Sequence, residues 1–192
     1  MLYKSDLKAD LCRLMKICGE LELEQLRLYY SHQFKYKKHL DPYLDVLVAE
    51  RFMDKIVPED ESEPIKFRVK GKPPVDPDYQ KRITESFWIP AAHTAMYVRD
   101  IQTGGFPTLM TIIFEENKIM DLSVIRNKQE AQQAKINITN MIPEKTDDMI
   151  VHVAIVDSAK LASEIECYNV FDVWVMTKDI INGKKVDFYR SF

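Results

Sequence analysis

A proline-rich segment, residues 72–78 (KPPVDPD), constrains the fold of this chain more than any other stretch. Each of its three prolines fixes its own backbone φ, lacks an N–H donor and disfavours helix in the residue before it. Such a segment favours an extended connector over packed structure. We therefore expect two domains, residues 1–72 and 79–192, joined by a connector at residues 73–78.

The composition limits what these domains can be. The 192 residues are 46% hydrophobic and carry a net charge of -3, which excludes a disordered polyelectrolyte. The chain has only five glycines, about half the number expected from the usual share of roughly 7%. A glycine-rich phosphate-binding loop is therefore not expected. We expect no nucleotide or other small-molecule cofactor.

Targeting and cysteine signals are also weak. The first 30 residues are charged throughout, and no window reaches 18 apolar residues, so we expect no signal peptide, no membrane segment and a cytoplasmic protein. Three cysteines is an odd number, and none is spaced as CxxC. Neither a disulfide framework nor a zinc site is indicated, and no metal is expected.

Within residues 1–72 the spacing of hydrophobic residues changes from a helical period to the alternation of a strand. Apolar residues at helical spacing predict helices over residues 7–18, 21–30 and from about 38–41 to 51. Residues 55–57 and 65–69 then read as strands around an acidic turn at residues 58–64 (PEDESEP), here called the acidic tip. Three helices followed by a hairpin resemble a winged helix-turn-helix domain, in which the hairpin is the wing.

Basic residues gather where the third helix begins. In a winged helix this end approaches the major groove of double-stranded DNA, and cations there neutralise phosphates. A second basic row alternates along the second strand of the hairpin, so its members point one way. The predicted DNA-binding residues are Lys35, Lys37, Lys38, His39, Lys66, Arg68 and Lys70. The alternative for residues 31–39 is a solvated loop.

Two charge patterns oppose this hypothesis. Glu59, Asp60, Glu61 and Glu63 make the tip of the hairpin acidic, and a phosphate backbone would repel it. Residues 1–75 hold 14 basic and 13 acidic side chains, which is low for a DNA-binding domain. DNA affinity would then depend on a homodimer. A module that binds protein and not DNA is the alternative.

The second domain is predicted as α/β with a mixed sheet, in the order αβββαβαββ, which makes the whole chain α+β. Asn182 and Gly183 mark the turn of the last hairpin. The expected helices are residues 79–87, 128–141 and 159–167, and the expected strands are residues 94–101, 108–115, 118–125, 149–156, 170–176 and 186–192.

This order of elements resembles the core of the restriction-endonuclease-like fold. Together with the amino-terminal part, it resembles the replication-relaxation proteins of bacterial plasmids and other mobile elements. The resemblance implies metal ions held by an Asp on the second strand and a Glu-x-Lys on the third. The second strand here has no Asp, and the third has Asp121 without the pair. Glu116 and Lys118 have the Glu-x-Lys spacing, but they lie at the predicted turn before the third strand and not within the strand.

We therefore expect a DNA-binding accessory protein without catalytic residues, whose second domain is a degenerate nuclease fold. The alternative is a metal-dependent nuclease that uses Glu116, Lys118 and Asp121.

Overall fold

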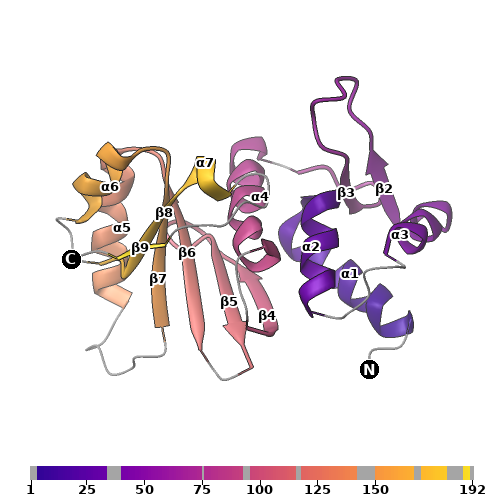
Figure 1. The fold of residues 1–192 in the computed structure, drawn as a ribbon, viewed down its shortest axis with the longest axis horizontal. Coiled ribbons are helices and arrows are strands. Elements are labelled where there is room, and N and C mark those ends of the chain that lie inside the picture. The colour runs from indigo at the N-terminus through magenta and orange to yellow at the C-terminus, as the bar shows by residue number, and fades with distance from the viewer. Residues whose placement is uncertain are drawn as a thin grey trace.

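The computed structural model describes residues 4–33, 40–74, 76–92, 96–115, 118–141, 150–166, 170–180 and 188–190. Over these residues the fold is α+β, with seven helices, a three-stranded antiparallel sheet and a six-stranded mixed sheet. Figure 1 shows the small sheet with α1, α2 and α3 on one side of the molecule and the large sheet on the other. The predicted fold class is confirmed at this level.

The amino-terminal part contains each element that the sequence predicted and one more. Its strands have the order β1-β3-β2, with β3 antiparallel to both neighbours. The elements are α1 (Lys4–Cys18), β1 (Glu20–Glu22), α2 (Leu23–Gln33), α3 (Leu40–Ala49), β2 (Met53–Ile56) and β3 (Lys66–Val69).

Strand β1 corrects the prediction that the second helix begins at Leu21. Leu21 is fully buried and pairs with Phe67 of β3, and the helix begins two residues later. The side chain of Gln25 accepts a hydrogen bond from the Glu22 N–H at 3.0 Å, next to the start of α2. Three residues are too few to show an alternating pattern, so the sequence carried no signal for this strand.

The large sheet has the strand order β4-β5-β6-β7-β8-β9. Strands β4, β5 and β6 are antiparallel, β6, β7 and β8 are parallel, and β9 is antiparallel to β8. The elements are α4 (Pro77–Ala92), β4 (Val98–Thr103), β5 (Met110–Phe114), β6 (Ile119–Ile125), α5 (Lys128–Met141), β7 (Ile150–Val156), α6 (Ala159–Glu166), β8 (Val173–Met176), α7 (Thr177–Ile180) and β9 (Tyr189–Arg190).

The predicted order αβββαβαββ is present, with the short helix α7 added after β8. The predicted turn at Asn182 and Gly183 lies outside the described residues. Alternate residues of the parallel strands face opposite layers. In β7, Val153 and Ile155 belong to the core cluster that includes α4, whereas Ala154 and Val156 pack with α5 and α6.

Helix α4 begins inside the predicted connector and ends beyond residue 87. Pro77 is its first residue, a position that proline tolerates well. The Asp76 carboxylate caps the helix by accepting the N–H groups of Asp78 and Tyr79 at 3.0 and 3.1 Å. The last two connector residues are therefore helical, because a local cap and a fixed φ outweigh the extended preference of the proline-rich segment.

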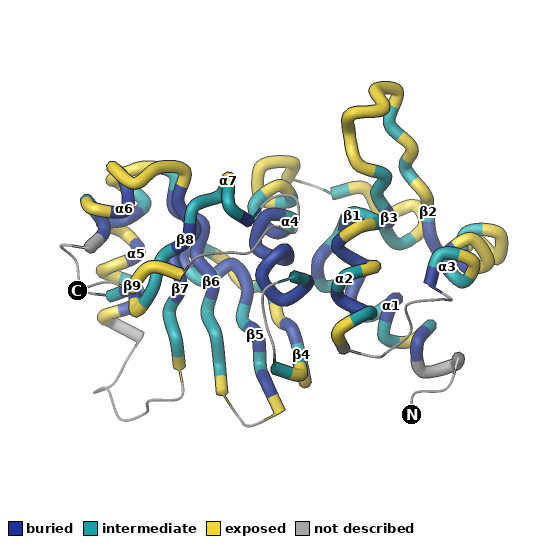
Figure 2. Tube along the Cα trace, in the orientation of Figure 1, coloured by how far each residue is buried: buried dark blue, intermediate teal, exposed yellow. Residues whose placement is uncertain are grey.

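Helix α4 packs against both parts of the chain. Its Phe87 ring lies 5.4 Å from the ring of Tyr29 on α2, measured between centroids. Residues 83 and 85–91 are all buried. One hydrophobic cluster holds Leu11 and Leu26 of the amino-terminal helices together with Leu122 of β6. Figure 2 shows α4 as a largely buried helix between the small and large sheets.

Candidate functional site

Helix α3 presents no basic side chain to solvent. Leu40, Leu44 and Leu47 form its buried stripe, and Asp45 and Val46 lie on its exposed side. The segment before it, which contains the predicted DNA contacts Lys35, Lys37, Lys38 and His39, lies outside the described residues. The structure therefore leaves the predicted basic entrance to α3 undescribed and shows a helix with acidic and apolar groups outward.

Each carboxylate of α3 pairs with a cation from a neighbouring element. Arg27 of α2 donates from Nε to Asp41 at 3.1 Å, and this hydrogen bond lowers the pKa of Asp41. Lys55 of β2 lies 3.0 Å from Asp45. In the same way, Lys8 of α1 lies 3.2 Å from Glu50, just after the helix. These ion pairs use cations that could otherwise contact phosphates on this side.

The predicted basic row on β3 is matched by carboxylates on both neighbouring strands. Arg68 lies opposite Glu20 of β1 and Asp54 of β2, with nitrogen-to-oxygen distances of 3.0 and 3.5 Å. Lys70 lies 2.7 Å from Asp54, and Lys66 is in register with Glu22. Hydrogen bonds from Lys70 and from the Gly71 N–H lower the pKa of Asp54 to about 2. Carboxylates on both sides therefore offset the charge of this row, and β1, which was not predicted from the sequence, supplies two of the three.

The acidic tip is exposed to solvent. Asp60 accepts the Ser62 N–H at 2.8 Å, which stabilises the turn. Among the described residues, none of the four carboxylates at residues 59, 60, 61 and 63 forms an ion pair. Figure 2 shows the β2–β3 hairpin as an exposed loop that projects from the body of the molecule. Negative charge is therefore concentrated at the most prominent point of this part.

Three apolar side chains of α3 and the segments that flank β2 are exposed. Val46 on α3 is 47% exposed and Val57, directly after β2, is 65% exposed. Phe52, between α3 and β2, is also exposed, and the Lys8 ammonium lies 3.4 Å from the centre of its ring. The outward side of α3 and both ends of β2 therefore each carry an exposed apolar residue.

The residues of the alternative nuclease site are only partly described. Glu116 lies outside the described residues, and Lys118 is exposed just before β6. Asp121 is half-buried on β6, where it accepts a hydrogen bond from the Thr111 hydroxyl at 2.7 Å. His152 on β7 was not predicted; its Nδ1 lies 3.6 Å from the Asp121 carboxylate, because the two residues are in register.

This arrangement does not gather metal ligands. Within the described ranges, no group of three or more His, Cys, Asp and Glu side chains could hold an ion. The strand register that brings Thr111, Asp121 and His152 together cannot be read from the sequence, since it depends on the pairing of β5, β6 and β7.

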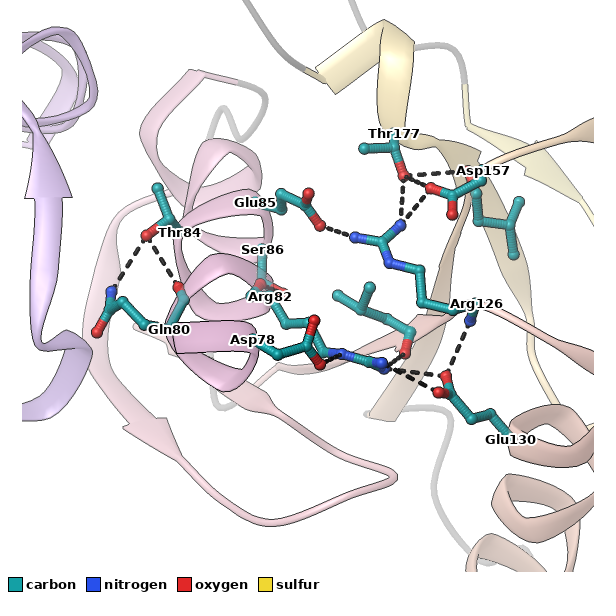
Figure 3. A network of polar contacts seen from close by, with 12 residues as sticks. Asp78, Gln80, Arg82, Thr84, Glu85, Ser86, Arg126, Glu130, Asp157 and Thr177 are labelled. Atoms are coloured by element: carbon teal, nitrogen blue, oxygen red, sulfur yellow. Dashed lines mark hydrogen bonds and ion pairs between the residues drawn. The ribbon is translucent and has the colours of Figure 1, made fainter. Parts of the chain in front are cut away.

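A polar network joins α4 to the carboxyl ends of the parallel strands (Figure 3). A polar residue directly follows each parallel strand: Arg126 follows β6, Asp157 follows β7 and Thr177 follows β8. Arg126 forms ion pairs with Asp157 and with Glu85 of α4 and donates to the Thr177 hydroxyl at 3.1 Å. This edge is where open α/β sheets bind ligands, but here two carboxylates already neutralise Arg126.

A second arginine of α4 extends this network. Arg82 donates two hydrogen bonds to Glu130 of α5, at 2.9 and 3.0 Å, and one to Asp78 at 3.0 Å. The hydrogen bond to Glu130 raises the pKa of Arg82. Burial alone would raise the pKa of Glu130, but Arg82 and the Arg126 N–H lower it. The network therefore holds α4 on the sheet and gives both Arg82 and Arg126 carboxylate partners.

No family model, curated protein or solved structure matches this chain. The functional argument therefore depends on the chemistry of its own surfaces. In the part of the chain that the structure describes, no helix combines the length and apolar character needed to cross a bilayer. The acidic tip of the β2–β3 hairpin, together with the exposed side of α3, which carries no cation of its own, is the best candidate for a binding site.

Proposed function

We propose that this chain is a non-catalytic winged-helix protein that binds another protein through the exposed side of α3 and the acidic tip. The order α1-β1-α2-α3-β2-β3 and the sheet order β1-β3-β2 support this proposal, since both are typical of winged helix domains. In that comparison α3 corresponds to the recognition helix and the β2–β3 hairpin to the wing.

The observation that carries the proposal is the charge of these two elements. Helix α3 has no cation, Arg68 and Lys70 are paired with carboxylates, and the acidic tip has no cation partner among the described residues. Duplex DNA is a dense array of negative charge, so it would be repelled where a winged helix normally contacts it. A protein surface with complementary charge fits these elements better.

The proposal is non-catalytic because, within the described ranges, Asp121 is not part of a group of three or more side chains that could hold a metal ion. Thr111 and His152 flank Asp121, which is consistent with the degenerate nuclease-like domain expected from the sequence. On the same resemblance, we propose a role as an accessory protein of a bacterial plasmid or mobile element.

Charge reversal at the acidic tip tests the proposal by gain of function. The variant Glu59→Lys, Glu61→Lys, Glu63→Lys should acquire salt-sensitive affinity for a fluorescent duplex DNA that the unaltered chain does not bind. The charge-neutral variant Glu59→Gln, Glu61→Gln, Glu63→Gln is the matched control and should gain much less. DNA binding by the unaltered chain that these changes do not strengthen would contradict the proposal.

DNA binding is the second candidate, and the run of Lys35, Lys37 and Lys38 before α3 favours it. These lysines could neutralise phosphates even if the wing does not approach the duplex. In this case the unaltered chain should retard duplex DNA, and the variant Lys35→Glu, Lys37→Glu, Lys38→Glu should abolish the shift. The matched control is Lys66→Glu, which lies opposite Glu22 and should have a smaller effect.

A further inference from the structure

We propose that helix α4 joins the two predicted domains into a single cooperative folding unit, so that neither part unfolds without the other. This coupling is independent of the proposed function. Helix α4 begins within the proline-rich segment and shares one hydrophobic cluster with α1, α2 and the large sheet. Two independent domains joined by a flexible connector would instead each have a hydrophobic core of their own.

One side of α4 completes the core of the amino-terminal part. Phe87 is fully buried, and its ring centroid lies 5.4 Å from that of Tyr29 on α2. Ile83, one turn earlier on α4, is buried in the same cluster as Leu11 and Leu26. Separation of α4 from the amino-terminal helices would expose these apolar side chains to water, which opposes any unfolding confined to one part.

Hydrogen bonds to backbone carbonyls fasten the same junction. The Gln80 amide of α4 donates to the carbonyls of Cys18 and Glu20 at 3.0 and 2.8 Å. In the opposite direction, the fully buried Gln25 amide of α2 donates to the Thr84 carbonyl of α4 at 2.6 Å. Buried polar groups that lose their partners destabilise a fold strongly, so these contacts also oppose separation of the two parts.

The other side of α4 is fixed to the large sheet and its helices. Glu85 pairs with Arg126 after β6, and Arg82 pairs with Glu130 of α5. Figure 3 shows these ion pairs on the side of α4 that is turned away from Gln80. The helix is therefore held on both sides, and the two parts cannot separate along either side without breaking buried contacts.

Contacts outside α4 also join the two parts. Arg13 of α1 forms an ion pair with Asp100 of β4. The Thr103 hydroxyl at the end of β4 donates to the Ile17 carbonyl of α1 at 3.1 Å. The proline-rich segment is therefore not expected to act as a hinge. In a single folding unit, a ligand that binds the amino-terminal part also stabilises the large sheet.

Urea unfolding of the full chain, followed with one probe in each part, tests this proposal. Trp174 fluorescence reports on the large sheet once Trp88 is replaced by Phe, and pulse labelling of the buried Cys18 thiol reports on α1 once Cys12 and Cys167 are replaced by Ser. Both probes are read in the same variant. Their midpoints should coincide, as in two-state unfolding. Two separate midpoints would overturn the proposal.

Core substitutions far from the junction test the coupling in both directions. Leu11→Ala in α1 and Ile165→Ala in α6 each remove a buried side chain from one part. Each should lower both midpoints equally, by roughly 1 M urea. Ile136→Ser, at an exposed position of α5, is the control and should shift neither midpoint. A shift confined to the probe in the altered part would overturn the proposal. If a core variant does not fold, the comparison of midpoints in the parent variant still decides.

Discussion

Glu85 and Arg126 form an ion pair between the buried helix α4 and the carboxyl end of β6. The two side chains are only 10% and 20% exposed, so water does little to solvate either charge. Arg126 also pairs with Asp157, which is more exposed. Removing one member of a buried pair leaves an uncompensated charge, and this usually costs more than the pair itself contributes.

Loss of the arginine should therefore destabilise the fold. We expect Arg126→Met to lower the free energy of unfolding by about 3 kcal/mol, because Glu85 is left without its partner. Adding Glu85→Gln to that variant should recover part of the loss. Urea denaturation measures both effects. Arg190→Met, at an exposed position of β9, is the control and should stay within about 0.5 kcal/mol of the unaltered chain. An unchanged midpoint for Arg126→Met would contradict the assigned role.

Two glycines with positive φ offer a matched pair of substitutions. Gly71 has a φ of +67°, and the space where a Cβ would lie is open. Gly71→Ala should therefore lower the free energy of unfolding only through backbone strain, by about 1 kcal/mol. Gly19 has a φ of +76°, and a Cβ there would lie 2.1 Å from the Gln80 Oε1. The Gln80 amide donates to the carbonyls of Cys18 and Glu20 at 3.0 and 2.8 Å.

Gly19→Ala should therefore lower the free energy of unfolding by about 2 kcal/mol or more, because it adds the loss of hydrogen bonds from Gln80 to the backbone strain. In a Gln80→Ala background the same change should cost less, because the obstructing side chain is gone. Thermal or urea unfolding of the four proteins gives the coupling. Equal costs for Gly19→Ala and Gly71→Ala would show that Gln80 does not constrain this turn.

The pH dependence of stability should report on Asp54. Its pKa of about 2 lies below the usual value of 3.8, through hydrogen bonds from Lys70 and the Gly71 N–H. A depressed pKa means that the folded state prefers the charged carboxylate. This stabilisation is complete above about pH 4 and is lost as the pH falls toward 2.

Between pH 4 and pH 2 the unaltered chain should lose more stability than Asp54→Asn, which has no carboxylate to protonate. Urea denaturation across this range measures the difference, and carboxyl NMR should give a titration midpoint for Asp54 near 2. Glu61→Gln, at an exposed position of the acidic tip, is the comparison variant and should leave the pH dependence nearly unchanged. A midpoint near 4 for Asp54 would mean that the hydrogen bonds from Lys70 and Gly71 do not form in solution.

Thiol reactivity tests the packing at the end of α1. Cys18 is buried, and burial raises its pKa to about 12, which Arg13 only partly opposes. In a Cys12→Ser, Cys167→Ser variant, Cys18 should not react with a disulfide reagent at pH 8 until urea is added, because the thiolate is the reacting form. Rapid labelling without urea would show that this end of the helix opens readily.

Residues with local signals were predicted well from the sequence. Leu7, Leu11 and Leu14 repeat at helical spacing, and α1 buries all three. The strand β1 and the helix α7 were missed because three or four residues cannot establish a period. The start of α4 was misplaced because the cap at Asp76 outweighed the extended preference of the prolines that precede it.

The candidate site was harder to predict than the fold. Lys66 and Arg68 alternate as the sequence suggests, but their charge is offset by Glu20, Glu22 and Asp54, which reach them only through strand pairing. A linear charge pattern contains no information on that register. In the same way, Arg126 and Asp157 are 31 positions apart and meet only because β6 and β7 are adjacent and parallel.

The most direct measurement of the central claim is a comparison of two affinities at one salt concentration. The full chain is titrated into a labelled peptide of alternating lysine and leucine and, separately, into a labelled duplex DNA of random sequence. Both titrations are made at about 0.1 M salt, where the Debye length is roughly 10 Å. The negative charge of the acidic tip predicts that the peptide binds at least about tenfold more tightly than the duplex, a difference of roughly 1.4 kcal/mol. Tighter binding to the duplex, lost when Lys35, Lys37 and Lys38 are changed to Glu, would contradict the claim and establish DNA as the ligand.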